Sequence, residues 1–513
     1  MRENPQVAIV GAGPAGLSAA AVLARCGARV TAYDENDRPG GQLFKQIHKF
    51  FGSGHHGAGV RGVELGCQLL AECEAAGVEI CLSHTVYGIF PGGRLGVTHA
   101  GYSRIIRAEK ILIATGATEK ALAFPGWDLP GVMGAGAAQT MVNLNRVLPG
   151  RRIIMVGSGN VGLVVGFQLL QAGAHLAAVV EAKSQISGYA VHANKLMRAG
   201  VPILTGHTVL EARGRDSVEE VTIGRVDERY RPIPGTERTI EADTVCLAVG
   251  LTPSIELLRM ANVGLTHLPP MGGYLPLHSG TLCTTNPDIY VAGDVAGIEE
   301  ASTAMEEGRL AGHCRGAGPA GGSRSRAADG GDPPACGPAA NRPPWGSPRH
   351  RQSGTGEEVC PVAEQLKRGP HAVIECTEEI PCNPCCTACP QGAVTMAEGL
   401  SSLPCLNRGK CTGCGLCIPC CPGQAIFVID DTYSGSEGLL SLPYEFTPLP
   451  IVGQSVILTD RRGRPVGEGT IHRVLCPPVF HQTAVVTLRV PLALLDTVRG
   501  FLPTSGKEVL HEG

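Results

Sequence analysis

The first forty residues alternate apolar runs with a glycine-rich turn. Residues 7–10 form an apolar run of strand length, and glycines follow at positions 11, 13 and 16. An alanine-rich stretch then continues to about Arg25, and a second apolar run covers residues 29–33. Short apolar runs bounded by turns are typical of buried strands, and the longer stretch between them has helical length. The pattern therefore predicts a strand–turn–helix–strand, or βαβ, unit.

The same pattern returns about 145 residues later, and it again has the length of one βαβ unit. Residues 153–156 form a strand-like run, a glycine turn begins at Gly157, a helical stretch reaches Gln171, and residues 176–180 form the second strand. The first 315 residues therefore carry two units of one kind in tandem.

The texture changes after residue 315. Residues 316–355 contain 9 Gly and 7 Pro, a composition that cannot offset the entropy of ordering, and they are expected to form a disordered linker. A cysteine-rich segment follows at 356–430. In the tail, 431–513, residues 455–459 and 484–490 have the pattern of strands and 491–498 that of a short helix.

Composition and charge narrow the classes of function. The chain has 43 basic and 46 acidic residues, a net charge of −3 and 4% aromatic residues, which argues against nucleic acid as a partner. The most apolar stretch, 152–181, is interrupted by five glycines and by polar side chains, so no membrane span is expected. Eleven of the 21 cysteines fall between Cys376 and Cys421. Such clustering indicates metal ligation by reduced thiols and hence a cytoplasmic chain.

The first glycine turn has the spacing of a dinucleotide-binding site. Glycines at these positions permit a tight turn and let backbone N–H groups approach a pyrophosphate, while a carboxylate at the end of the second strand accepts a hydrogen bond from a ribose hydroxyl. The expected binding residues are Gly11, Gly13, Pro14, Ala15, Gly16, Asp34 and Glu35.

The second turn predicts a second nucleotide site, at Gly157, Gly159, Asn160, Gly162 and Glu181. A carboxylate at position 181 would repel a 2′-phosphate, so NAD(H) is favoured over NADP(H). ATP would suit the same residues. The glycines are also compatible with a duplicated domain that keeps them for packing alone.

With these turns, further segments resemble the two-dinucleotide-binding FAD/NAD(P)-dependent oxidoreductase superfamily. The matching segments are 39–42, with Gly41 and Gln42; 113–116, with Ala114, Thr115 and Gly116; 249–253; and 285–294, with Gly293 and Asp294. The resemblance implies an α/β fold in which a FAD domain, 1–118 and 248–315, is interrupted by an NAD-type domain, 119–247. It also implies that Asp294 binds the flavin ribityl chain. No Cys-x-x-Cys follows residue 116 or lies in the second unit, so a redox disulfide is not expected there, and Cys26, Cys67, Cys73 and Cys81 are expected to be buried.

The cysteine-rich segment contains the ligand spacing of bacterial ferredoxins. Cys411, Cys414, Cys417 and Cys421 follow that spacing and end in a proline, and Cys382, Cys385 and Cys389 repeat it with Glu379 in the first position. In two-cluster ferredoxins the fourth cysteine of each run ligates the other cluster. The spacing thus predicts a ferredoxin-like α+β module in which Cys389, Cys411, Cys414 and Cys417 hold one [4Fe–4S] cluster.

A second cluster would use Cys382, Cys385 and Cys421, with Cys376 as the preferred fourth ligand. Cys405 and Glu379 are the rivals for that position, and a three-iron cluster or none is the alternative. The sequence assigns no catalytic acid or base. His48, His55 and His56 follow the Gly41 turn, but exposed or helix-packing roles account for them.

The combination resembles the large subunits of amino-acid dehydrogenases, such as the alpha chain of dye-linked L-proline dehydrogenase, the A component of opine oxidase and the FAD-binding component of hydrogen cyanide synthase. The resemblance implies a FAD- and iron–sulfur-dependent subunit that relays electrons for a proline-, opine- or sarcosine-like substrate. A second FAD-containing subunit would oxidise the amino or imino acid, and a ferredoxin or another carrier would exchange electrons. The alternatives are a self-sufficient NADH-dependent ferredoxin-type reductase and a structural assembly subunit with bound ATP.

Overall fold

The computed structural model describes residues 4–316 and 368–503. All of the expected linker except its first residue, Gly316, therefore lies outside the described residues, together with residues 1–3, the first part of the cysteine-rich segment and the last ten residues. Within the described part the chain forms two compact units. The first comprises residues 4–47, 62–119 and 250–316, and the second comprises 48–61, 120–249 and 368–503.

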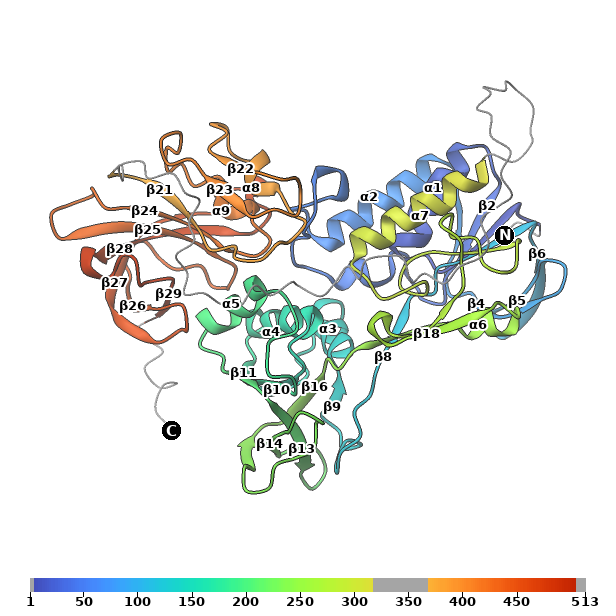
Figure 1. Ribbon diagram of the computed structural model, residues 1–513, viewed down its shortest axis with the longest axis horizontal. Coiled ribbons are helices and arrows are strands. Elements are labelled where there is room, and N and C mark those ends of the chain that lie inside the picture. The colour runs from blue at the N-terminus through green and yellow to red at the C-terminus, as the bar shows by residue number, and fades with distance from the viewer. Residues whose placement is uncertain (1–3, 317–367, 504–513) are drawn as a thin grey trace. The chain divides into compact units, whose positions relative to one another are not determined.

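The first unit is built on a parallel sheet with helices packed beside it (Figure 1). The sheet has the order β20 (Ile289–Val291), β7 (Lys110–Ile113), β1 (Val7–Val10), β2 (Val30–Tyr33), β3 (Glu79–Cys81). Its main helices are α1 (Pro14–Arg25), α2 (Gly62–Ala75) and α7 (Ala301–Gly316), and α7 lies along α1. The strands and the helix of the expected βαβ unit are confirmed. Strand β1 is fully buried, and α1 starts at a proline, which is favoured in the first turn of a helix.

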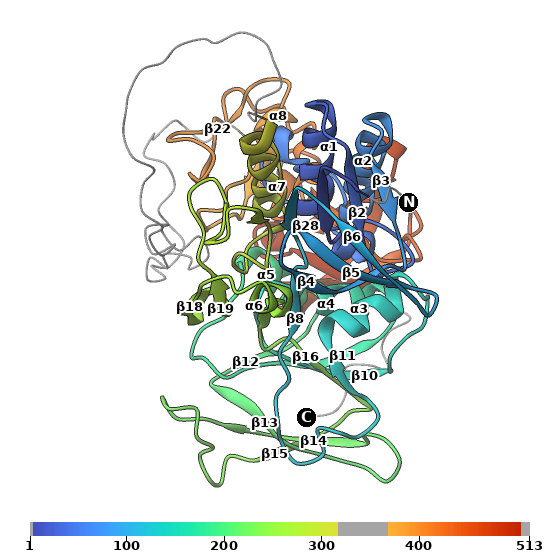
Figure 2. The same cartoon turned by 90° about the vertical axis from the view of Figure 1, so that its right-hand side faces the viewer.

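Smaller sheets complete the first unit. An antiparallel sheet, labelled in Figure 2, contains β4 (Thr85–Phe90), β5 (Arg94–His99) and β6 (Tyr102–Arg107). Two-stranded pairs join β8 (Ala117–Glu119) to β17 (Leu251–Pro253) and β18 (Leu265–Leu268) to β19 (Gly273–Pro276), and α6 (Glu256–Met260) packs on β4.

The second unit repeats the parallel-sheet arrangement. Its sheet has the order β12 (Ile203–Thr205), β11 (His175–Glu181), β10 (Arg152–Val156), β16 (Thr244–Leu247), β9 (Val132–Gly134). The helices are α3 (Ala135–Asn143), α4 (Asn160–Gln171) and α5 (Ala190–Arg198), and an antiparallel sheet contains β13 (His207–Arg213), β14 (Glu220–Arg225) and β15 (Arg238–Glu241). The second expected βαβ unit is thereby confirmed at β10, α4 and β11.

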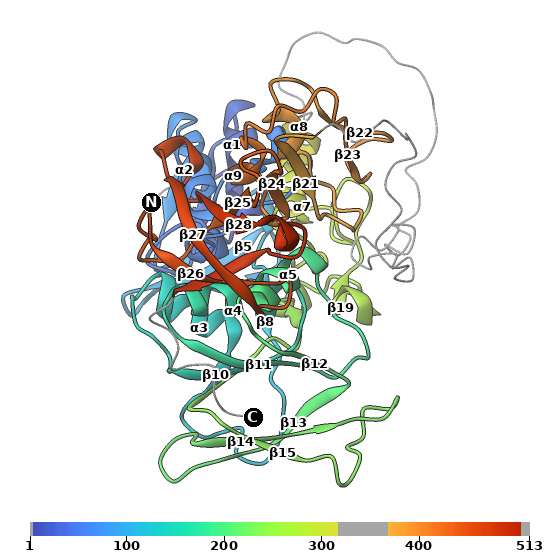
Figure 3. The same ribbon diagram turned by 90° about the vertical axis from the view of Figure 1, so that its left-hand side faces the viewer.

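The rest of the second unit is a seven-stranded antiparallel sheet that carries the cysteine-rich segment (Figure 3). Its order is β21 (His371–Ile374), β24 (Ile426–Asp430), β25 (Glu437–Tyr444), β28 (Ala484–Pro491), β27 (Pro465–Leu475), β26 (Ser455–Thr459), β29 (Gly500–Pro503). The cysteine segment adds α8 (Pro384–Thr387), α9 (Cys417–Cys420) and the pair β22 (Val394–Met396) and β23 (Pro404–Leu406). The expected strands at 455–459 and 484–490 are confirmed, whereas the expected helix is a single 3₁₀ turn, Leu492–Leu494.

The expected border at 430/431 falls inside this sheet, because β24 pairs with β21 on one side and with β25 on the other. One apolar core accordingly joins strands from both sides of the border. No helix among residues 4–316 and 368–503 is both long enough and apolar enough to cross a membrane.

Candidate functional site

The glycine turn of the first unit leaves open the space in front of helix α1. Gly11 has a φ of +104°, and a Cβ there would lie 2.3 Å from the carbonyl oxygen of Ala114. A Cβ at Gly16 would lie 1.9 Å from the carbonyl oxygen of Gly11. These two glycines are therefore required by the turn and its packing. At Gly13, by contrast, the nearest atom to a Cβ would be Cα of Gly41 at 4.0 Å, so the N–H groups at the start of α1 stay accessible to a phosphate.

Asp34 lies beside this turn at the end of β2. Its carboxylate is 7% exposed and accepts hydrogen bonds from the backbone N–H of Ala12 at 2.7 Å and of Asn36 at 2.9 Å. Glu35, the next residue, is exposed. The arrangement orients one carboxylate toward the glycine turn, as a ribose-binding acid requires.

The return segment contacts the start of the same helix. A Cβ at Gly293 would lie 3.0 Å from the Cβ of Ala15, and the backbone N–H of Gly293 donates to the buried carboxylate of Glu307 at 2.8 Å. Burial raises the pKa of the neighbouring Asp294 to about 6, and the carboxylate of Glu307 adds to that rise. Glu307 was not predicted from the sequence, because nothing along α7 distinguishes it from the neighbouring Glu306.

The segment 113–116 joins β7 to the crossing between the domains. The backbone N–H of Ala114 donates to Val10 at 2.8 Å, and the hydroxyl of Thr115 donates to the carbonyl of Ser254 at 2.9 Å. Gly116 has a φ of +69°. The bond between Thr115 and Ser254 connects the outgoing segment with the returning one, and all of these residues belong to the first unit.

The second unit reproduces the geometry of the first turn. Gly157 also has a φ of +104°, with a Cβ position 2.3 Å from the carbonyl oxygen of Ala248, and no atom lies within 4 Å of a Cβ at Gly159. A Cβ at Gly162 would lie 2.2 Å from the carbonyl oxygen of Gly157. The two turns are structural repeats of each other.

Glu181 takes the position that Asp34 has in the first unit. Its carboxylate accepts the backbone N–H of Ser158 at 3.0 Å, the Ser158 hydroxyl at 2.6 Å and the Ser187 hydroxyl at 3.1 Å. The loop that carries Ser187 also places Gly188 against the turn, with a Cβ position 2.9 Å from Gly159. Gly188 corresponds to Gly41, whose Cβ position is 2.9 Å from Gly13. The correspondence is visible from these two contacts and not from the sequence.

Four cysteines of the ferredoxin-type spacing surround one cavity in the second unit. Cys389, Cys411, Cys414 and Cys417 line it together with uncharged residues, which include Val394, Leu406 and Val428. The backbone N–H of Ala372 points at Sγ of Cys411 at 3.4 Å, and that of Ala393 at Sγ of Cys389 at 3.3 Å. N–H groups directed at sulfur are a feature of iron–sulfur sites. The set of donors, four sulfurs with N–H groups directed at two of them, has the chemistry that an iron–sulfur cluster requires.

The other cysteines of the runs, Cys376, Cys382 and Cys385, lie near Cys421, the residue that directly follows helix α9. Burial raises the pKa values of the Cys376, Cys382 and Cys385 thiols, and the nearby Cys421 adds to each rise. Cys376, Cys382 and Cys421 pack against the same small core. Cys405 instead lies on β23 opposite Thr395. Among the described residues no three histidine, cysteine or acidic side chains converge closely enough to hold a single metal ion.

Comparison with known proteins assigns the first part of the chain to a family. Residues 5–308 match the family of pyridine nucleotide-disulphide oxidoreductases. The chain belongs to this family. Oxidoreductases of this kind bind FAD and a nicotinamide nucleotide, which confirms the resemblance expected from the motifs.

Individual relatives agree with this assignment. The A component of opine oxidase from Agrobacterium tumefaciens is 31% identical over 326 residues, which cover 59% of this chain and 63% of that protein. The HcnB component of hydrogen cyanide synthase from Pseudomonas aeruginosa is 32% identical over 336 residues, covering 60% and 70%. The chain thus spans less than two thirds of the length of that opine oxidase component. Thioredoxin reductase of T. acidophilum shares the fold, with a TM-score of 0.50 and 20% identity over 61% of this chain and 97% of that one.

The cysteines of the matched region differ from the expectation in part. Cys73 and Cys81 are buried, as expected, but Cys26 and Cys67 are exposed. Cys26 is the residue that ends helix α1 at a turn, and Cys67 lies on the outward side of α2, between the buried Leu65 and Leu69. Because both cysteines have apolar neighbours in the sequence, the sequence did not predict their exposure.

The three histidines after the Gly41 turn have different surroundings. His48 is enclosed in the second unit, where burial, Lys195 and Arg61 lower its pKa to about 3, so the ring is neutral. His55 is exposed, and His56 forms a hydrogen bond with the Ser53 hydroxyl at 2.8 Å.

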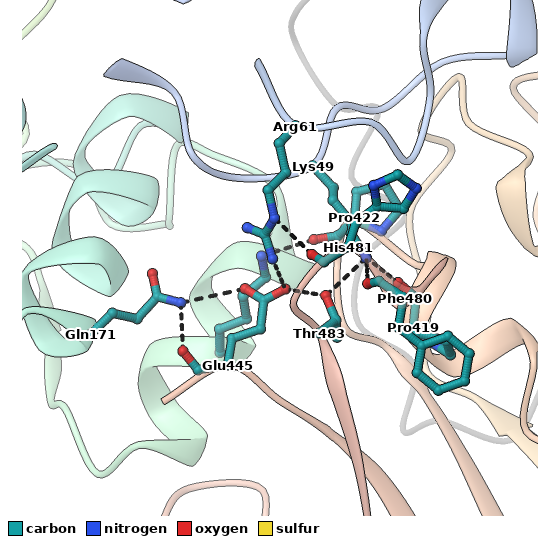
Figure 4. Close-up of polar contacts among 10 residues, drawn as sticks. Lys49, Arg61, Gln171, Pro419, Pro422, Glu445, Phe480, His481 and Thr483 are labelled. Atoms are coloured by element: carbon teal, nitrogen blue, oxygen red, sulfur yellow. Dashed lines mark hydrogen bonds and ion pairs between the residues drawn. The ribbon is translucent and has the colours of Figure 1, made fainter. Parts of the chain in front are cut away.

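A buried polar network connects segment 48–61 with the C-terminal sheet (Figure 4). The guanidinium of Arg61 contacts the carboxylate of Glu445 at 3.2 Å and donates to the carbonyl of His481 at 2.8 Å. The hydroxyl of Thr483 also donates to the carboxylate of Glu445, and the side-chain amide of Gln171 donates to the backbone carbonyl of Glu445 at 2.9 Å. These bonds explain why residues 48–61 belong to the second unit, although the chain order places them in the FAD domain.

Replacing Glu445 by Leu is expected to destabilise the second unit by about 3–5 kcal/mol, because it leaves the Arg61 guanidinium buried without its carboxylate. The Arg61 and Glu445 side chains are 9% and 10% exposed. Denaturant unfolding of the variant measures this. Glu241→Leu is the control, since Glu241 on β15 is 78% exposed and lies 3.9 Å from Arg152. Equal unfolding midpoints for the two variants would contradict the prediction.

Proposed function

We propose that this chain is the electron-relaying subunit of a dehydrogenase complex that acts on a proline-, opine- or sarcosine-like amino or imino acid. The observation that carries the proposal is the cavity lined by Cys389, Cys411, Cys414 and Cys417, on the same chain as two nucleotide-binding turns. FAD converts two-electron into one-electron transfer when bound, and [4Fe–4S] clusters transfer single electrons.

The residues of the first unit would hold FAD. The N–H groups in front of α1, left open at Gly13, would bind the pyrophosphate, and Asp34 would accept a ribose hydroxyl. Gly41 and Gln42 would border the flavin side of the turn, and Gly293 and Asp294 would bind the ribityl chain. The pKa of Asp294, raised to about 6, brings the protonated carboxyl within reach of neutral pH, where it can donate as well as accept a hydrogen bond.

The two cysteine sets would hold one cluster each. The cavity cysteines would bind the first, and Cys376, Cys382, Cys385 and Cys421 the second. Proximity to Cys421 supports Cys376 over Cys405 as the fourth ligand, since Cys405 pairs across a strand with Thr395. Reduced thiols are needed for both, which supports a cytoplasmic location.

The relatives support the presence of partner subunits. The opine oxidase and hydrogen cyanide synthase relatives are both named as subunits, which supports a second, FAD-containing subunit that oxidises the small-molecule amino or imino acid. A ferredoxin or another carrier would then exchange electrons with the clusters.

NADH is expected to reduce the flavin faster than NADPH. The Glu181 carboxylate at the second turn would accept the 2′-hydroxyl of NADH and repel the 2′-phosphate of NADPH. Stopped-flow absorbance under anaerobic conditions measures both rates. Equal rates, or faster reduction by NADPH, would contradict the assignment of Glu181.

The same experiment separates a second candidate function. The repeat geometry at Gly157, Gly159 and Glu181 also favours a self-sufficient NADH-dependent ferredoxin-type reductase. Sustained electron transfer from NADH to ferredoxin by the isolated chain would support that function. Transfer only in the presence of an amino acid and a small FAD-containing partner would support the relay. Binding of ATP without reduction by either nucleotide would favour a structural subunit.

A further inference from the structure

Buried lysines hold the chain around Cys421 by its carbonyl groups. The ammonium of Lys49 donates to the carbonyls of Pro419 and Phe480, the latter at 2.9 Å, and to the hydroxyl of Thr483 at 2.9 Å (Figure 4). The ammonium of Lys195, on helix α5, donates to the carbonyl of Pro422 at 2.9 Å. Lys49 and Lys195 are 4% and 6% exposed, so both charges are buried next to the turn 419–422.

Positive charge outnumbers negative charge on this side of the cysteine segment. Lys49, Lys195 and Arg61 act together on one carboxylate, that of Glu445. Arg198 donates to the carbonyl of Gln424 at 3.0 Å and is attracted to a second carboxylate, Glu375. Glu375 itself contacts Arg461 and Arg499, each at 2.6 Å. Each carboxylate thus faces three cations.

Two further carboxylates lie on this side, Glu378 near Cys376 and Asp496 near Arg499, and the cations still outnumber the carboxylates. Sulfur is a further anionic partner of these cations. The Cys421 thiol interacts electrostatically with Lys49, Lys195 and Arg198, and Cys420 with Lys49. A buried excess of positive charge is costly unless an anion compensates it. A cluster held by four thiolates carries net negative charge and gains one more negative charge with each electron. These surroundings would therefore suit an anionic cluster at Cys421 and would favour its reduced form.

The first cavity lacks this environment. Apart from its four cysteines, the side chains that line it are uncharged: Ala372, Ala388, Gln391, Ala393, Val394, Leu406, Thr412, Gly413, Gly415, Leu416 and Val428. Net charge near a cluster is one of the factors that set its reduction potential. The two cysteine sets therefore differ in the net charge around them, which influences which cluster is reduced first.

We propose that Lys49 and Lys195 are positioning residues that raise the reduction potential of the cluster at Cys376, Cys382, Cys385 and Cys421 above that of the cluster in the cavity. The inference rests on the proposed function, because it requires both clusters. Each reduction adds one electron to one cluster and moves no proton. The site at Cys421 would thus be the first of the two to hold an electron at equilibrium.

An anaerobic potentiometric titration of the full chain, followed by electron paramagnetic resonance, tests the inference. Lys195→Gln keeps a hydrogen-bond donor for Pro422 but removes the charge. One buried charge near the site is expected to change the ratio of reduced to oxidised cluster about tenfold, or about 59 mV for a one-electron couple. The potential of the Cys421 cluster should fall by that amount, and the potential of the cavity cluster should stay unchanged.

Matched variants keep the experiment decisive. Lys183→Gln removes an exposed lysine of the same unit and should shift neither potential, because solvent screens that charge. Lys195→Arg keeps the charge and should restore the wild-type value. Cys414→Ala, which disrupts the cavity site, assigns the two signals.

The outcomes separate this inference from the proposed function. Two clusters with the Cys421 potential unmoved in Lys195→Gln, or with both potentials moved equally, would overturn the inference alone. A wild-type chain that binds a single cluster would overturn the two-cluster assignment and the inference with it. If Lys195→Gln loses iron, Lys49→Gln provides the same comparison through the other lysine, and an unmoved potential there overturns the inference.

Discussion

Gly13→Val is expected to yield a folded chain that retains no FAD. A Cβ at Gly13 meets no atom closer than Cα of Gly41 at 4.0 Å, and the residue has an ordinary φ of −80°, so a Cβ at this position strains neither the backbone nor the packing. Its side chain instead fills the space in front of α1 where the pyrophosphate would bind. Flavin absorbance per chain after purification measures the loss, and circular dichroism verifies the fold.

Gly159→Val is the matched control in the repeated turn. No atom lies within 4 Å of a Cβ at Gly159, and its φ is −67°, so this variant should keep FAD and lose reduction by NADH. Wild-type flavin content in Gly13→Val would contradict the assignment of the first turn. Loss of flavin in both variants would show that the two turns do not act separately.

Replacing Cys376 by Ala is expected to remove one iron and to convert a four-iron signal into a three-iron signal. The wild-type chain should contain about eight irons if two clusters form on the ferredoxin pattern. Removing Cys376 leaves one iron without a protein thiolate, and that iron is the most easily lost. Iron analysis together with electron paramagnetic resonance of the anaerobic protein measures both effects.

Two further cysteine variants bracket this result. Cys414→Ala should disrupt the other cluster, because Cys414 lines the cavity. Cys405→Ala should leave the iron content unchanged, since Cys405 belongs to the β22–β23 pair. A Cys376→Ala spectrum identical to that of the wild type would assign the fourth position to Cys405, to Glu379 or to no protein group.

Local patterns were sufficient to predict the nucleotide turns. The pattern that predicts β1, α1 and β2 spans about thirty residues, the length of a single βαβ unit. The geometry of this unit therefore follows from positions that are close in sequence. The carboxylates Asp34 and Glu181 were predicted for the same reason, because Asp34 directly follows the second strand of its unit and Glu181 ends the second strand of the other.

Contacts between distant segments could not be predicted in this way. Lys49 bonds to Phe480 and Thr483, and Arg61 to Glu445, across more than 380 positions. Nothing in the segment 48–61 indicates these partners, which bring it into the second unit. The seven-stranded sheet likewise depends on the pairing of β21 with β24. Tertiary packing, and not the local sequence pattern, decides which strands pair.

The most direct test of the proposed relay is the number of electrons that the anaerobically purified full chain accepts in a dithionite titration. One FAD takes two electrons and each of two clusters takes one, so we expect about four electrons per chain. Absorbance of the flavin and of the sulfur-to-iron bands follows the titration. An end point of about two electrons, with no acid-labile sulfide, would mean a flavoprotein without clusters and would contradict the proposed relay.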